Sequence, residues 1–110
     1  MKVTEMVERL SLTVFAGHDG LGRIVEGGYT SDLLSDVMGH ADAGSVWVTL
    51  QTHRNVMAIA SLRDLAAVII SSGEKPGNET IEQSNEDGIP LLGTTLSTYE
   101  ITGKLYSITG

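Results

Sequence analysis

The pattern of apolar and polar positions along the chain predicts strands that alternate with helices. Short apolar runs bounded by turn residues are typical of buried strands, and three such runs lie at residues 46–50, 66–70 and 89–93. The segments between them have either apolar positions at helical spacing or a polar composition with a capping residue in front. Helices are expected at residues 5–10, 55–64, 78–87 and 97–108, with a single helical turn at 35–38.

The first third of the chain carries weaker signals. Thr4 is suited to cap the first helix, and residues 12–16 form a strand-like run followed by a glycine-rich turn at 17–20. Residues 23–33 are expected to be extended, with an interruption at Gly27-Gly28. Paired glycines inside a strand pattern indicate a bulge, or a place where a ligand or another backbone comes close.

From residue 46 onward the alternation has the form of βαβ units, which favours a parallel sheet with helices packed on it. The expected fold class is therefore α/β, with a mostly parallel sheet and flanking helices in a single domain over residues 1–110. Pro90 cannot donate a hydrogen bond to a neighbouring strand. Its strand is expected to lie at a sheet edge, or to pair on one side only near Pro90.

Polar residues follow three of the predicted strands at the point where each strand ends. They are Gln51 to Asn55, then Ser71 to Gly73, then Gly93 to Thr98. The carboxyl ends of parallel strands meet at one rim, where ligands bind in open α/β sheets. Hydroxyls, amides and free N–H groups there would suit a phosphate or another anion. The alternative is that these residues only cap helices.

Composition narrows the classes of partner. The net charge is −7 and the seven Lys and Arg residues are scattered singly, which argues against a nucleic acid polymer but not against a single nucleotide. Charged residues make up 19% of the chain, below the ~25% of average domains, which favours self-association. The absence of cysteine excludes disulfides and thiolate chemistry. Neither a signal region nor a membrane-length apolar run is present, so a cytoplasmic protein is expected.

No motif predicts catalysis, a metal or a cofactor. His18, His40 and His53 stand alone, without metal-ligand spacing, and the glycines at 17–22 fit neither a P-loop nor a dinucleotide fingerprint. An enzyme would need His53 within hydrogen-bond reach of a carboxylate such as Asp32 or Asp36. Ser31, Asp32 and Ser35 are interpreted equally well as capping residues. Trp47 and Tyr29 are interpreted as core or interface anchors.

Residues 22–37 resemble the DRTGG domain family, through Arg23 followed by Gly27-Gly28 and the run Ser-Asp-Leu-Leu-Ser-Asp at 31–36. The likeness continues at 47–53, 55, 89–92 and 94–95, and so covers nearly the whole chain. Gly22 stands where the family usually carries the Asp of its name. The resemblance implies a fold akin to the N-terminal domain of HPr kinase/phosphorylase, which is not the catalytic half of that enzyme.

The family also implies a function class. DRTGG domains accompany phosphotransacetylases and CBS-domain inorganic pyrophosphatases, where the region is regulatory and dimeric, with adenine nucleotides as ligands in the pyrophosphatases. Short stand-alone members are similar to proteins encoded among iron-hydrogenase genes. The resemblance therefore implies a regulatory module and supplies no catalytic residue.

We therefore expect a homodimeric, non-catalytic module that binds a small anionic ligand such as a nucleotide. Arg23 or Arg54 would pair with its charge, and Gly27-Gly28 would allow close approach of the ligand or a second subunit. The expected ligand-binding residues are Arg23, Gly27, Gly28, Thr52, His53, Arg54, Asn55, Thr94 and Thr95. The alternative is a protein-interaction accessory of an enzyme complex, hydrogenase-associated, with no small-molecule ligand.

Overall fold

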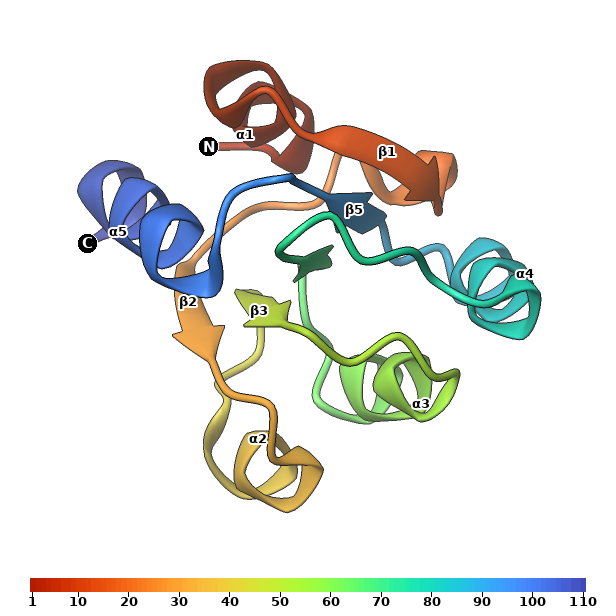
Figure 1. Ribbon diagram of the computed structural model, residues 1–110. Helices are drawn as coiled ribbons and strands as arrows, with labels where there is room; N and C mark the ends of the chain where they lie inside the picture. Colours follow the sequence, from red (N-terminus) through yellow and green to blue (C-terminus); the bar gives the residue numbers. More distant parts are fainter.

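A five-stranded sheet forms the centre of the molecule in the computed structural model, which describes residues 1–110 (Figure 1). The strand order is β1-β5-β4-β3-β2. Strands β2 to β5 run parallel, and β1 pairs antiparallel with β5. The prediction of an α/β fold with a mostly parallel sheet is confirmed. The strands are β1 (Thr13–Ala16), β2 (Gly27–Thr30), β3 (Ser45–Thr49), β4 (Ala67–Ile70) and β5 (Leu91–Gly93).

Helices cover both faces of this sheet, so the molecule has three layers. On one face lie α1 (Val3–Leu10) and α5 (Thr98–Thr109), and both chain termini are on that side (Figure 1). The other face carries α2 (Leu34–His40), α3 (Asn55–Leu62) and α4 (Asn78–Asp87). A short 3-10 helix, η1 (His18–Gly20), follows β1. No helix is long and apolar enough to cross a membrane.

The two central strands explain the continuous apolar runs of the sequence. Every residue of β3 and β4 is buried, because helices cover these strands on both faces. Side chains alternate between two separate cores, with Val46 and Val48 on the α1–α5 side and Trp47 on the other. Trp47 is fully buried, and its ring N–H donates to the carbonyl of Ser31 at 2.8 Å. Trp47 is therefore a core residue, as predicted.

Two predictions about strand geometry are wrong in part. β5 lies inside the sheet, because β1 pairs with its second side, so the edge alternative for Pro90 fails. The carbonyl of Pro90 accepts from the N–H of Val68 in β4 at 3.0 Å, so Pro90 pairs on the β4 side, as the second alternative predicts. Gly27 and Gly28 form no bulge but pair in register with β3; the bulge of this sheet lies in β1, between Val14 and Ala16.

Helix starts were predicted with mixed success. α1 begins at Val3, not after Thr4, because the N–H of Thr4 already bonds the carbonyl of Leu21 at 2.9 Å. A neighbouring segment thus satisfies the helix start, and no Thr4 cap is needed. For the last helix the sequence offers Ser97 or Thr98 as the cap, and the structure has Ser97, which accepts from the N–H of Glu100 at 3.2 Å. Gly39 lies inside α2 and does not end it.

Candidate functional site

The three polar loops predicted to share one rim do meet in the structure. The N–H of Gly73, after β4, donates to the carbonyl of Thr94, after β5, at 2.8 Å. The N–H of Gly77 donates to the carbonyl of Thr52, after β3, at 3.4 Å. These bonds join the loops because β3, β4 and β5 are parallel and end at the same side of the sheet.

Most polar groups of this rim are engaged in holding the loops. The hydroxyl of Thr80 donates to the carbonyl of Thr52 at 2.7 Å, and the hydroxyls of Ser71 and Thr98 bond each other at 2.7 Å. The hydroxyl oxygen of Thr94 accepts from the N–H of Leu96 at 3.2 Å. Every buried side-chain polar atom has a partner. Many of the hydroxyl and backbone groups of the rim therefore form hydrogen bonds within the loops and are not free to bind a ligand.

The other predicted rim residues, His53, Arg54 and Asn55, are exposed at the start of α3. The guanidinium of Arg54 lies 3.7 Å from the carboxylate of Glu79. Arg54 and Asn55 line an open hollow of about 450 Å³ that also contains Asp87. The carboxylate of Glu79 therefore competes with an anion for the guanidinium of Arg54.

Arg23, Gly27 and Gly28 are not brought to this rim. They lie before or at the start of β2, at the opposite end of the parallel strands. The Nε of Arg23 donates to the carbonyl of Gly88 at 3.0 Å, and its Nη1 lies 3.3 Å from a carboxylate oxygen of Asp64. Arg23 thus connects three distant segments, and its guanidinium already has partners.

A second cluster, which the sequence analysis missed, lies between α1, the loop after β5, and α5. Here an open pocket of about 530 Å³ is lined by Arg9, Thr94, Thr95, Lys104 and Ser107, with Leu96 and Ile108 among the apolar residues. No Asp or Glu lines it. Neither Arg9 nor Lys104 belongs to an ion pair. We call this site the Arg9–Lys104 pocket.

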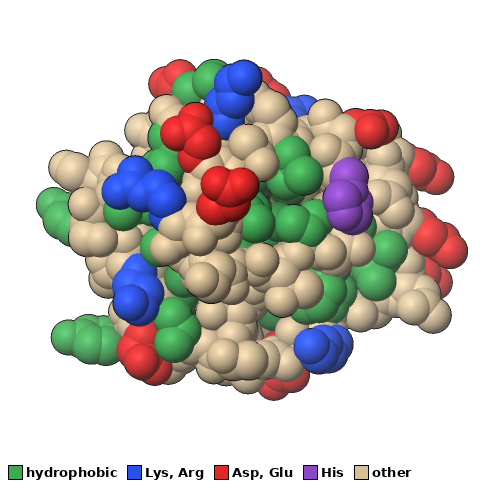
Figure 2. Space-filling view, turned by 90° about the horizontal axis from the view of Figure 1, so that it is seen from above, with side chains coloured by type: hydrophobic (Ala, Val, Ile, Leu, Met, Phe, Trp, Pro, Cys, Tyr) green, Lys and Arg blue, Asp and Glu red, His purple; other side chains and the backbone are tan.

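This pocket has the features that a small anion needs. In a chain of net charge −7, it brings two unpaired cations together with the hydroxyls of Ser11, Thr94, Thr95 and Ser107. The hydroxyl of Ser107 donates to the carbonyl of Lys104 at 2.6 Å, which leaves the other three as donors for a ligand. Figure 2 views the molecule from the side of α1 and β1. Lys and Arg side chains lie on its left, the side of α5 in Figure 1, and Asp and Glu side chains lie next to them. Guanidinium, ammonium and hydroxyl donors together suit a phosphate group.

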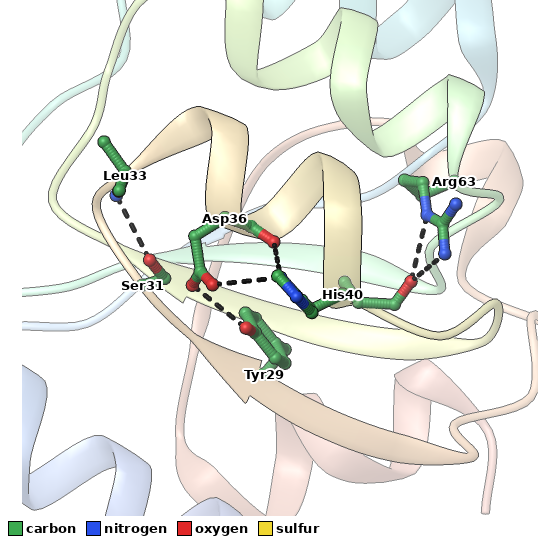
Figure 3. Close-up of polar contacts among 7 residues, drawn as sticks. Tyr29, Ser31, Leu33, Asp36, His40 and Arg63 are labelled. Atoms are coloured by element: carbon green, nitrogen blue, oxygen red, sulfur yellow. Dashed lines mark hydrogen bonds and ion pairs between the residues drawn. The ribbon is translucent and has the colours of Figure 1, made fainter.

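A polar cluster of Tyr29, Asp36 and His40 joins β2 to α2 (Figure 3). The hydroxyl of Tyr29 donates to Asp36 Oδ2 at 2.9 Å, and His40 Nδ1 lies 3.3 Å from Asp36 Oδ1. Hydrogen bonds from Ser31 and Tyr29 lower the pKa of the Asp36 carboxyl, and the bond to Asp36 raises the pKa of Tyr29. A tyrosine with a raised pKa stays neutral, so this cluster ties β2 to α2 and offers no activated phenolate.

The Asp36 carboxylate predicts a specific dependence of stability on pH. A carboxyl whose pKa is lower in the folded state stabilises the fold above its unfolded-state pKa, and this is lost as the pH falls through its folded-state pKa. Urea unfolding from pH 7 to pH 2 should therefore show a smaller loss of stability below about pH 4 for Asp36→Asn than for the wild type. Parallel profiles for the two proteins would contradict this assignment.

Asp32 holds the ends of β2 and β3 together. Its Oδ1 accepts from the hydroxyl of Thr49 at 2.9 Å and from the N–H of Leu50 at 2.7 Å. The carbonyl of Asp32 accepts from the side-chain amide of Gln51 at 3.1 Å. Neither Asp32 nor Asp36 bonds His53, whose Nδ1 accepts from the N–H of Asn55 at 3.2 Å. The contact that a His53-based enzyme would need is not formed.

Replacing Asp32 by alanine is expected to destabilise the protein by about 1–3 kcal/mol, because the fully buried Thr49 hydroxyl loses its acceptor. Urea unfolding would measure the change. Asp42, also exposed and with no side-chain hydrogen bond or ion pair, provides the matched control, and Asp42→Ala should stay within about 0.5 kcal/mol of the wild type. Equal effects of the two substitutions would show that the Asp32 bonds add nothing.

Comparison with known proteins identifies a related fold. No family model and no curated protein sequence matches the chain. Among solved structures, it is similar to a crystal structure of the CBS and DRTGG domains of the regulatory region of Clostridium perfringens pyrophosphatase, complexed with the activator diadenosine tetraphosphate. The TM-score is 0.69 at 12% sequence identity, over 96% of this chain and 45% of that chain. The fold is DRTGG-like. This chain spans less than half of the neighbour's length.

Proposed function

We propose that this chain is a non-catalytic regulatory domain that binds a small phosphate-bearing anion, such as a nucleotide, in the Arg9–Lys104 pocket. The observation that carries the proposal is this pocket, which is lined by two cations free of ion pairs and by four hydroxyls, and by no Asp or Glu. Thr94 and Thr95 belong both to this pocket and to the residues expected from the sequence to bind a ligand.

The structural neighbour supports a regulatory role. The matched chain comes from the regulatory region of a pyrophosphatase and was crystallised with a nucleotide activator. Transferred to this chain, that property suggests a ligand with several phosphates. Arg9 would bind one phosphate through its planar guanidinium and Lys104 a second, or another oxygen of the same group. The proposal includes a homodimer in the cytoplasm. Gly27, Gly28, Thr52, His53, Arg54 and Asn55 stay predicted contacts of a rim-bound ligand.

Thermal unfolding in the presence of phosphate compounds tests the proposal. A ligand at about one hundred times its Kd stabilises the folded state by ~2.7 kcal/mol, which raises the Tm of a chain of this size by several degrees. We expect this shift with pyrophosphate and ATP but not with adenosine, and we expect it to shrink as salt is added. No shift with any phosphate compound, or an equal shift with adenosine, would contradict a site built around Arg9 and Lys104.

The alternative is a protein-interaction accessory with no small ligand. This alternative is favoured by two large apolar side chains that are exposed to solvent, Leu33 and Leu62, with exposed fractions of 64% and 71%. This alternative predicts that a partner, such as a hydrogenase subunit, co-purifies with the chain. It also predicts that removal of Arg9 and Lys104 leaves that association intact.

A further inference from the structure

The outer face of α5 carries two exposed tyrosines. The exposed fraction is 89% for Tyr99 and 72% for Tyr106. By contrast, Trp47 is fully buried and Tyr29 is partly buried. Between the two tyrosines lie Thr102 and Gly103, where α5 is narrow. An open hollow of about 610 Å³ lies at this place and is lined by α5 residues alone. Exposed aromatic rings around a hollow are typical of a protein–protein contact.

The charges beside this hollow favour a second copy of the chain as its occupant. Glu100 and Lys104 lie one turn apart on the same flank of α5, yet they form no ion pair with each other. Only one carboxylate oxygen of Glu100 is used within the chain, in the cap with Ser97, and Lys104 has no acidic partner. When two copies of such a helix lie antiparallel, the free anion of each copy faces the free cation of the other, so the surface is complementary to itself.

We propose that two copies of this chain associate through the outer faces of their α5 helices, which run antiparallel and cross near Thr102 and Gly103. In this arrangement Glu100 faces Lys104 of the partner subunit, and the same pair repeats across the two-fold axis. The same register places Tyr99 beside Tyr106 of the partner subunit, so that each ring enters the other chain's hollow. Thr102 and Gly103 allow close approach of the two backbones at the crossing.

A second hollow extends the same face. It measures about 230 Å³, lies between α5 and β2, and shares Thr102 and Tyr106 with the first. On the opposite flank, Lys104 and Ser107 line both the tyrosine hollow and the Arg9–Lys104 pocket. The inferred interface therefore borders the anion pocket. It rests on the proposed homodimer but not on the proposed anion. Lys104 belongs to both sites, so in the dimer it lies between Glu100 of the partner subunit and the anion, and Arg9 is the cation that only the anion contacts.

Sedimentation equilibrium of the wild type and of two lysine variants tests this interface. Tyr106→Lys should raise the dimer Kd at least about tenfold, because an aromatic anchor is lost and a further cation is placed in the interface. Leu62→Lys removes an equally exposed apolar side chain on α3, across the sheet, and should leave the Kd within about twofold. A dimer that resists Tyr106→Lys, or that Leu62→Lys weakens equally, would overturn the α5 interface while leaving the homodimer in place.

A cysteine cross-link gives an independent test, since the chain has no cysteine of its own. A β-carbon at Gly103 meets no atom within 4 Å, so Gly103→Cys should fold normally. Because the two copies of residue 103 lie near the axis, oxidised glutathione should convert this variant to a covalent dimer. Ala58→Cys, exposed on α3, should stay monomeric on the same non-reducing gel. Equal cross-linking of both variants would overturn the interface. A wild type that is monomeric at all concentrations would overturn both the interface and the homodimer, while phosphate binding is measured separately.

Discussion

Replacing Gly28 by valine is expected to lower the free energy of unfolding by about 1–3 kcal/mol, whereas Gly27→Val changes it by less than about 0.5 kcal/mol. A β-carbon at Gly28 would lie 2.9 Å from Leu105 Cδ2, and Leu105 is buried in the core beneath α5. A β-carbon at Gly27 meets nothing within 4 Å. The two positions are neighbours in the same strand, so the pair isolates the contact with α5.

Urea unfolding followed by the fluorescence of Trp47, the only tryptophan, measures both variants. A third variant sharpens the result. Leu105→Ala alone opens a cavity and destabilises the protein, but in combination with Gly28→Val it makes room for the added methyl groups. The two substitutions should therefore cost less together than the sum of their separate effects. Strict additivity, or equal losses for Gly27→Val and Gly28→Val, would show that the approach of α5 does not require Gly28.

This contact refines the sequence-based view of the glycine pair. The pair was interpreted as a bulge, or as a close approach of a ligand or second backbone. Neither a bulge nor a left-handed backbone conformation explains the glycine at position 28. Gly28 pairs regularly with Val46, and its φ is not positive. The close neighbour is a side chain of α5, a helix some seventy-five residues further along the chain. No local pattern around residue 28 contains that information.

The parts of the fold that were predicted well are those with local signals. The β3 and β4 runs are apolar at every position, and a strand covered on both faces is the simplest explanation. The cap of the last helix, predicted at Ser97 or Thr98 and found at Ser97, is likewise a local signal. The shared rim followed from parallel strand order alone. The sequence left open whether β5 lies at an edge, because its interior position depends on β1, which lies far away in sequence and pairs in the opposite direction.

The candidate site was harder to predict for the same reason. Arg9 and Lys104 come from opposite ends of the chain and meet only because α1 and α5 cover the same face of the sheet. From the sequence each is one of seven scattered cations. Arg23 and Arg54 were singled out because they lie near motifs, but each has a carboxylate beside it, Asp64 for Arg23 and Glu79 for Arg54. Unpaired charge, which selects an anion site, is a property of the folded chain.

The double variant Arg9→Ala/Lys104→Ala is expected to weaken pyrophosphate binding about one hundredfold, because each charge-assisted bond contributes at least ~1.5 kcal/mol and tenfold in Kd corresponds to ~1.4 kcal/mol. Isothermal titration calorimetry at low salt would measure the Kd. The control is Arg54→Ala/Lys75→Ala, which removes the same charge from exposed positions in the rim loops. Because both variants lower the net charge equally, a general electrostatic effect would weaken binding in both alike.

These two variants also separate the two possible locations of the ligand. Neither Arg9 nor Lys104 is buried or ion-paired within the chain, so the Arg9→Ala/Lys104→Ala protein should keep its fold. Because Lys104 also faces Glu100 of the partner subunit in the inferred dimer, sedimentation equilibrium must first show that the variant associates as the wild type does. If binding is lost there and retained in Arg54→Ala/Lys75→Ala, the ligand lies between α1 and α5. The reverse result would place it at the rim with Thr52, His53, Arg54 and Asn55, as the sequence predicted, and would contradict the Arg9–Lys104 pocket. Because Thr94 and Thr95 lie at both locations, the cations decide between them.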